Sequence, residues 1–184
     1  MRDGELLTYW IAPSTPKQLS QQIERVLLIV DALLDLDLER TSDRSLAQLE
    51  IEKRASDSRT TVDSVTGERV AVIGEAIPKA SSWLVEWTST STNNDLETVV
   101  HELGHVFGLA HPNPEDPRDK RYSSADSVMS YNRNSAAPGR FFTPTDRDAL
   151  TSLWGRENDA PTQRNNWVKP TFTLTQTSSQ QDIQ

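Results

Sequence analysis

The sequence predicts an α+β fold of α/β-like character, and two patterns carry this expectation. Near the N-terminus, a segment with a helical apolar stripe lies between two short strand-like segments, the second of which alternates in polarity. This order is typical of a strand, a crossover helix and a second, parallel strand. Further along, a histidine-rich segment with helical periodicity and a short last helical segment predict a central and a C-terminal helix.

The first elements follow from short apolar patterns. Residues 7–11 are expected to form a strand, and a helix should follow with Thr15 as its N-cap and Pro16 at its first position. One stripe of this helix is apolar and predicts packing on a core: Leu19, Ile23, Val26, Leu27, Val30, Leu33 and Leu34. Residues 35–41 and 46–53 alternate in polarity, so both are expected to be strands.

The middle of the chain predicts one loop and one strand. Residues 55–74 are expected to form a hairpin or a long loop that turns at Thr66 and Gly67. Residues 82–88 alternate again, which predicts a strand with Trp83, Val85 and Trp87 on one face and Leu84, Glu86 and Thr88 on the other.

All three histidines of the chain lie in one short stretch that reads H-E-x-x-H-x-x-G-x-x-H. A helix places His101 and His105 on one face because they are four residues apart. Gly108 can adopt the left-handed conformation that ends a helix, and the turn would bring back His111. Three neutral imidazoles bind Zn²⁺ and leave one position open, as in catalytic sites. Glu102 is near enough to reach a water beside the metal without binding the metal.

Two simpler interpretations of this stretch are weaker. A bare H-E-x-x-H occurs by chance on amphipathic helices, but the added glycine and the third histidine make coincidence a poor explanation. A structural zinc site normally closes with four cysteine or histidine ligands, and this chain offers three histidines and no cysteine.

The segments around the motif predict its boundaries. Asn94 is a candidate N-cap of the histidine-bearing helix, with Glu97 completing a capping box. A final helix is expected over residues 144–154, with Gly155 as its stop. In the polar segment 113–124, Asp116 and Asp119 could bind Ca²⁺, but a solvated loop is favoured because regular oxygen-ligand spacing is absent.

A methionine downstream of the motif points to a family. Met129 lies in Ser-Val-Met-Ser-Tyr, which alone would predict a turn with a buried, gap-filling methionine. After the long histidine motif it resembles the Met-turn of the metzincin zinc metallopeptidases, with matrixin-like and serralysin-like catalytic domains as the nearest patterns. The resemblance spans about residues 8–155 and includes the closing segments 142–146 and 153–155.

The resemblance implies a zincin fold with a twisted, mostly parallel sheet, an antiparallel edge strand, a central zinc-binding helix, a Met-turn and a C-terminal helix. It implies a zinc-dependent metalloendopeptidase, with Zn²⁺ on the three histidines and Glu102 as general base. Met129 would form an apolar floor beneath the ligands. Tyr131 would be an extra ligand or a transition-state donor, and a packed or solvent-facing tyrosine is the alternative.

The resemblance also implies a substrate strand. In this family an edge strand pairs with an extended polypeptide above the zinc, and residues 82–88 are the expected equivalent. The candidate substrate-binding residues are Trp83, Leu84, Val85 and Glu86. The chain departs from the family in two ways, because it has neither a cysteine that could block the zinc nor glycine-rich calcium-binding repeats. A non-catalytic zinc-binding interaction module is the alternative function, although Glu102 would then have no role.

Length and charge limit what the domain organisation, the partners and the location of the protein can be. The 184 residues fit one catalytic domain, residues 1–156, and a polar tail, residues 157–184, expected to be a disordered segment or a linker. A net charge of −8 argues against nucleic acid as a partner. No apolar run is long enough to span a membrane and no export signal is visible. The resemblance nevertheless favours an extracytoplasmic or secreted protein over a cytoplasmic one, and a monomer is expected by default.

Overall fold

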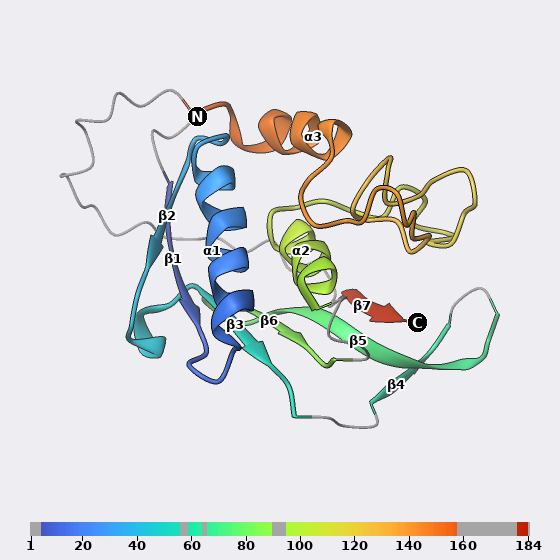
Figure 1. Cartoon of the computed structure of the whole chain (residues 1–184), viewed down its shortest axis with the longest axis horizontal. Helices are drawn as coiled ribbons and strands as arrows, with labels where there is room; N and C mark the ends of the chain where they lie inside the picture. The colour runs from blue at the N-terminus through green and yellow to red at the C-terminus, as the bar shows by residue number, and fades with distance from the viewer. Residues whose placement is uncertain (1–4, 56–58, 64–65, 90–94, 158–179, 184) are drawn as a thin grey trace.

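The computed structural model describes residues 5–55, 59–63, 66–89, 95–157 and 180–183 (Figure 1). The helices are α1 (Lys17–Asp31), α2 (Asp95–Val106) and α3 (Pro144–Trp154), with a 3₁₀ turn at Arg44–Leu46. The strands are β1 (Glu5–Ile11), β2 (Leu36–Arg40), β3 (Leu49–Lys53), β4 (Thr60–Val62), β5 (Arg69–Pro78), β6 (Trp83–Trp87) and β7 (Gln180–Ile183). Over the described residues these strands form one sheet in the order β2-β1-β3-β6-β5-β4, with β7 also paired to β5.

The sheet is mostly parallel, as the sequence predicts. β1 pairs in parallel with both β2 and β3, and β3 pairs in parallel with β6. α1 is the crossover between β1 and β2, because it lies between them in the chain and leads into a parallel neighbour. β5 runs antiparallel to β6, so the antiparallel part of the sheet begins there.

The core lies between the sheet and the helices α1 and α2 (Figure 1). α1 turns the predicted apolar stripe inward: Leu19, Ile23, Val26, Leu27 and Val30 are buried. Burying a side chain of this size contributes about 1.5–3 kcal/mol, so the stripe is a main source of stability for this half of the molecule. α1 and α2 also contact one another, and this contact fixes the histidine-bearing helix over the sheet.

The start of α1 differs slightly from the prediction. The helix begins at Lys17, and Pro16 rather than Thr15 is the N-cap residue. Pro16 has a ψ of 134°, which is extended and keeps it outside the helix, and no side chain caps the first turn.

The prediction that residues 82–88 form the edge strand is wrong. β6 pairs with β3 along one side and with β5 along the other, so its backbone groups are already used on both sides. Trp83, Leu84, Val85 and Glu86 are therefore interior residues of the sheet and cannot pair with a substrate strand. The next strand outward is β5, which pairs on its outer side with β4 at residues 69–71 and with β7 at residues 72–76. It lies in a region where the sequence predicts only a hairpin or loop up to residue 74.

The tail contributes to the sheet. The sequence predicts no regular structure for residues 157–184, yet residues 180–183 form β7, which runs antiparallel to β5. Residues 158–179 lie outside the described part of the chain. No helix in the described residues is both long and apolar enough to cross a membrane.

Candidate metal centre

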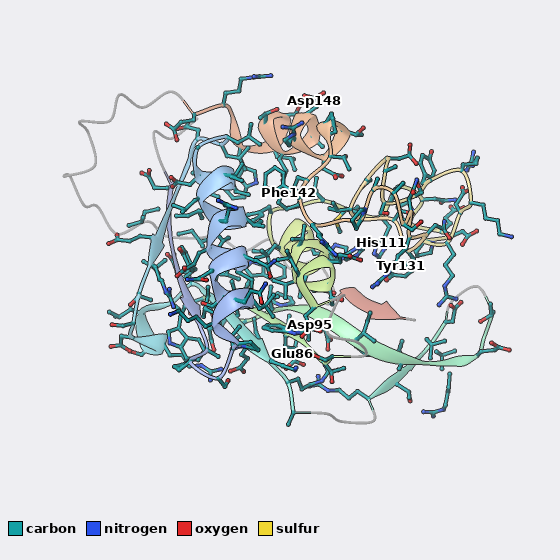
Figure 2. All side chains as sticks on the ribbon, in the orientation of Figure 1. Glu86, Asp95, His111, Tyr131, Phe142 and Asp148 are labelled. Atoms are coloured by element: carbon teal, nitrogen blue, oxygen red, sulfur yellow. The ribbon has the colours of Figure 1, made fainter. Side chains whose placement is uncertain are left out.

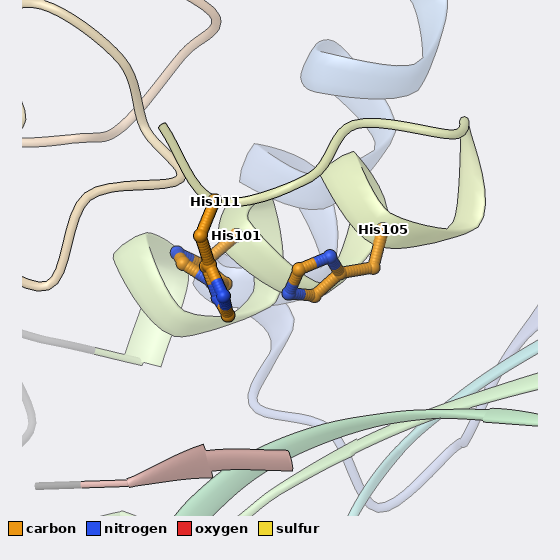
Figure 3. Close-up of side chains that lie close together, drawn as sticks. All are labelled: His101, His105 and His111. Atoms are coloured by element: carbon orange, nitrogen blue, oxygen red, sulfur yellow. The ribbon is translucent and has the colours of Figure 1, made fainter. Parts of the chain in front are cut away.

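The three histidines of the motif come together at the end of α2 (Figure 3). α2 ends at Val106, and Gly108 has a φ of 97°, which confirms the predicted left-handed turn. This turn lets the amide of Leu109 donate to the carbonyl of Gly104 at 2.8 Å and directs the chain back toward the helix. One ring nitrogen from each of His101, His105 and His111 then lies within 4.8 Å of the others.

Backbone carbonyls orient two of the imidazoles. His101 Nδ1 donates to the carbonyl of Val128 at 2.7 Å, and His105 Nδ1 donates to the carbonyl of Leu109 at 3.0 Å. A carbonyl oxygen only accepts, so in the neutral rings the proton is on Nδ1 and the lone pair is on Nε2. Outer hydrogen bonds of this type fix the tautomer and the ring orientation of metal-binding histidines.

The donor set fits one zinc ion. His101 Nε2 and His111 Nε2 are 3.3 Å apart. Two nitrogens bound at about 2.0–2.1 Å to one tetrahedral zinc are separated by roughly 3.3–3.4 Å, so this spacing agrees with shared coordination. Imidazole nitrogen is also a preferred zinc ligand. The three histidines could therefore hold a metal ion.

Glu102 is fully buried beside this centre, against the backbone of β5. Gly74 of β5 makes this contact possible, because a Cβ atom at that position would lie 2.4 Å from Glu102 Oε1 and 2.5 Å from Thr98 Cγ2. Gly74 was not among the site residues predicted from the sequence. A glycine directly after the strand-like segment Val70–Ile73 is the signal that could have found it, since a glycine within a strand often marks a bulge or a close approach.

Met129 packs against α2 on the side of Gly104. It is 1% exposed, and a Cβ atom at Gly104 would lie 2.4 Å from its sulfur. The structure therefore places the methionine of the predicted turn against the helix that carries the histidines. Its role as an apolar floor beneath a metal stays a prediction.

A buried carboxylate fastens the turn that contains Met129. Asp146 Oδ1 accepts from Ser127 Oγ at 2.6 Å, and Oδ2 accepts from the Val128 amide at 3.0 Å. Asp146 also forms a capping box with Thr143 at the start of α3. The carboxylate thus joins α3 to the residue whose carbonyl orients His101. The pattern Thr-Pro-Thr-Asp could have indicated the cap, but no local signal indicates the contacts with Ser127 and Val128.

Tyr131 lies beside the histidines, next to His111 in Figure 2. Its ring centroid is 4.7 Å from that of His111 and 5.6 Å from that of His101. The side chain is half-buried, and its ring lies beside two of the predicted ligands. Whether it binds metal or donates to a reacting group stays a prediction.

A pocket of about 260 Å³ adjoins the centre. It is lined by Ile73 of β5, by Thr98 and His101 of α2, and by Val128 and Tyr131 of the methionine-containing turn.

The predicted N-cap of α2, Asn94, lies outside the described residues. The Glu97 carboxylate pairs with Arg133 at 3.4 Å and with Arg140 at 3.5 Å, which ties α2 to the segment after the turn. The predicted capping box stays a prediction.

The acidic residues of loop 113–124 have protein partners. Asp119 accepts hydrogen bonds from Arg121 and Asn113, and the Arg121 guanidinium holds the pKa of Asp119 well below its usual range. Asp116 accepts from the Arg118 amide at 3.1 Å. Among the described residues, the group able to hold a metal through three side chains is the histidine cluster, so the suggested Ca²⁺ site gains no support.

Comparison with known proteins gives a likeness in fold. No family model and no curated protein matches the sequence. Among solved structures, the chain is similar to myroilysin, with a TM-score of 0.52 and 14% sequence identity. The match covers 86% of this chain and 96% of that one. At this level of identity the two proteins share a fold.

Proposed function

We propose that this protein is a zinc-dependent endopeptidase that hydrolyses peptide bonds of extended polypeptides. The observation that carries the proposal is the convergence of three imidazoles, those of His101 and His105 from α2 and that of His111 from the segment after the turn. Backbone carbonyls orient His101 and His105, and α2 also bears the buried Glu102. The likeness in fold to myroilysin, a metalloprotease, supports a peptidase. An extracytoplasmic place of action stays a prediction of the family resemblance.

Each residue of the centre has a chemical task in this proposal. The three histidines would hold Zn²⁺, which when bound acidifies a water and polarises the scissile carbonyl. A Glu102 carboxylate oxygen would take a proton from the attacking water and pass it to the departing amine nitrogen. The water oxygen, with one of its hydrogens, thus becomes the hydroxyl on the carbonyl carbon. The other proton goes to the amine nitrogen as the C–N bond breaks. Burial of Glu102 against β5 fixes its position for both transfers.

The substrate would add to β5 as a further strand. An extended peptide takes its main-chain hydrogen bonds from a sheet edge and its specificity from pockets beside that edge. The outer edge of β5 passes Glu102 at Gly74, and the 260 Å³ pocket opens beside Ile73 of the same strand. β5 therefore takes the substrate-pairing role in place of residues 83–86. Tyr131 is proposed as a donor to the reacting carbonyl because it lies next to His111.

The proposal is tested with an unfolded protein substrate. The zinc-loaded full chain should cleave casein, and removal of zinc with a chelator should abolish cleavage until zinc is restored. Product gels and bound-zinc analysis on the same samples give both readouts. A protein that keeps one zinc yet cleaves no peptide bond, even with the C-terminal variant described below, would favour the alternative of a non-catalytic zinc-binding module.

Gly74→Ala should lower kcat/KM for casein by about 10- to 100-fold, because small misplacements of catalytic groups have effects of that size. The added Cβ would lie 2.4 Å from Glu102 Oε1, so the carboxylate must move. Zinc content and melting temperature distinguish this from unfolding.

The double variant Gly74→Ala/Thr98→Ala separates the two contacts made by the added Cβ. It removes the 2.5 Å conflict with Thr98 Cγ2 and keeps the conflict with Glu102. Activity should stay low. Recovery of activity in the double variant would contradict displacement of Glu102 as the cause.

A further inference from the structure

The outer edge of β5 already carries a strand of the same chain. β6 pairs with residues 74–78 of β5, and β7 pairs with residues 72, 74, 75 and 76. Because residues 74–76 pair with both strands, β7 must lie on the edge opposite β6. This is the edge that the proposed function assigns to the substrate.

The pairing falls beside the catalytic carboxylate. Gly74 of β5 pairs with Asp182 of β7, and the same glycine is the residue against which Glu102 packs. β7 runs antiparallel along β5. In Figure 3, where it is drawn in faint red, it lies below the three histidines. The C-terminal strand therefore runs past the point where a scissile bond would have to lie.

We infer that the C-terminal strand β7 occupies the substrate position on β5 and holds the enzyme in a self-inhibited state. The inference rests on the proposed function. β7 is antiparallel to β5, and a substrate added to this edge would need the same outward-facing amide and carbonyl groups. The two strands compete for one set of hydrogen bonds, so they cannot be bound together. The tail acts as a tethered competitor whose backbone does what the backbone of a substrate would do.

The size of β7 makes the inhibition reversible. It comprises four residues, and its register with β5 shifts between Val72 and Gly74. A short edge strand with an interrupted ladder opens at a low free energy compared with global unfolding. Substrate would therefore bind in the fraction of molecules in which β7 has left the edge, and the apparent affinity would be reduced by that fraction.

Proline substitution in β7 tests the inference in the full, zinc-loaded chain. Neighbouring residues of a strand direct their amides to opposite edges, so either Gln181 or Asp182 donates toward β5. The double variant Gln181→Pro/Asp182→Pro removes that donor whichever it is, and proline is excluded from paired strand positions. Thr162→Pro/Gln163→Pro places the same change in the tail, well before β7, and is the matched control.

Two measurements read the outcome. In the β7 variant, amide hydrogen exchange at residues 72–76 should become faster, and kcat/KM for casein should rise roughly tenfold if about one molecule in ten is open in the parent chain. The gain should come from a lower KM with kcat unchanged, because the strand competes with substrate. A peptide of residues 173–184 added to the β7 variant should restore the parent KM, and the control variant should behave like the parent chain.

The possible failures are distinguishable. Unchanged exchange at residues 72–76 would overturn the pairing itself, with or without catalysis. Faster exchange with unchanged kcat/KM in an enzyme that cleaves casein would overturn the inhibition and leave the proposed function standing. Faster exchange with no cleavage by any form of the protein would refute the proposed function, and the inhibition with it.

Discussion

Replacing Glu102 with glutamine should lower kcat for casein by about 10²–10⁴-fold while zinc stays bound, which is the usual contribution of a general acid–base group. Glutamine has nearly the same shape, so it can occupy the fully buried site against Gly74. Its amide cannot take a proton from water near neutral pH. The loss should therefore appear in kcat, with bound zinc and melting temperature close to those of the parent chain.

Glu115→Gln is the control for this substitution, since it makes the same chemical change at an exposed position in the loop after the histidines. It should leave kcat unchanged. Near-parental turnover in a zinc-loaded Glu102→Gln protein would remove Glu102 from the mechanism. Loss of zinc together with loss of turnover would show that Glu102 acts on the metal centre rather than on the proton.

The metal centre was predictable because the residues that define its geometry are close together in the sequence. Two ligands four residues apart need only a helix, and the third needs only a turn that Gly108 permits. The distances between His101, His105 and His111 therefore depend on about ten consecutive residues. Burial of the α1 stripe was predictable for a similar reason. Helical periodicity identifies the apolar face of a helix from neighbouring residues alone, whatever element packs against that face.

The position of the edge strand was not predictable in this way. Alternation in residues 82–88 identifies a strand, but it does not say which neighbours pair with it. β5 was missed because Gly74 and Glu75 interrupt its apolar residues, and residues 55–74 were therefore predicted to form a hairpin or loop that ends at this glycine. In the structure Gly74 lies at a register shift and in contact with Glu102. The glycine that made β5 hard to recognise in the sequence is therefore the residue that leaves room for the Glu102 carboxylate. β7 was missed because a four-residue strand in a polar tail has no pattern of its own.

Asp146 provides the second large expected effect, and it connects stability with metal binding. Asp146→Ala should destabilise the protein by about 3 kcal/mol, because hydrogen bonds to a charged group contribute roughly 1.5–3 kcal/mol each and their buried donors lose a partner. The carboxylate is 3% exposed and accepts from Ser127 Oγ and the amides of Val128 and Thr143. Chemical unfolding of the parent chain and the variant measures the difference.

The same substitution should weaken zinc binding by about 10- to 100-fold, the usual effect of removing an outer partner of a metal ligand. The carbonyl of Val128 orients His101, and Asp146 holds the amide of that same residue. Competition with a chromogenic chelator measures the affinity under conditions where the variant is folded. Asp148→Ala, at an exposed position on the same helix (Figure 2), is the control and should change neither quantity. A destabilised Asp146→Ala protein with parental zinc affinity would show that the turn keeps its position without the carboxylate, and that α3 supports the fold but not the metal centre.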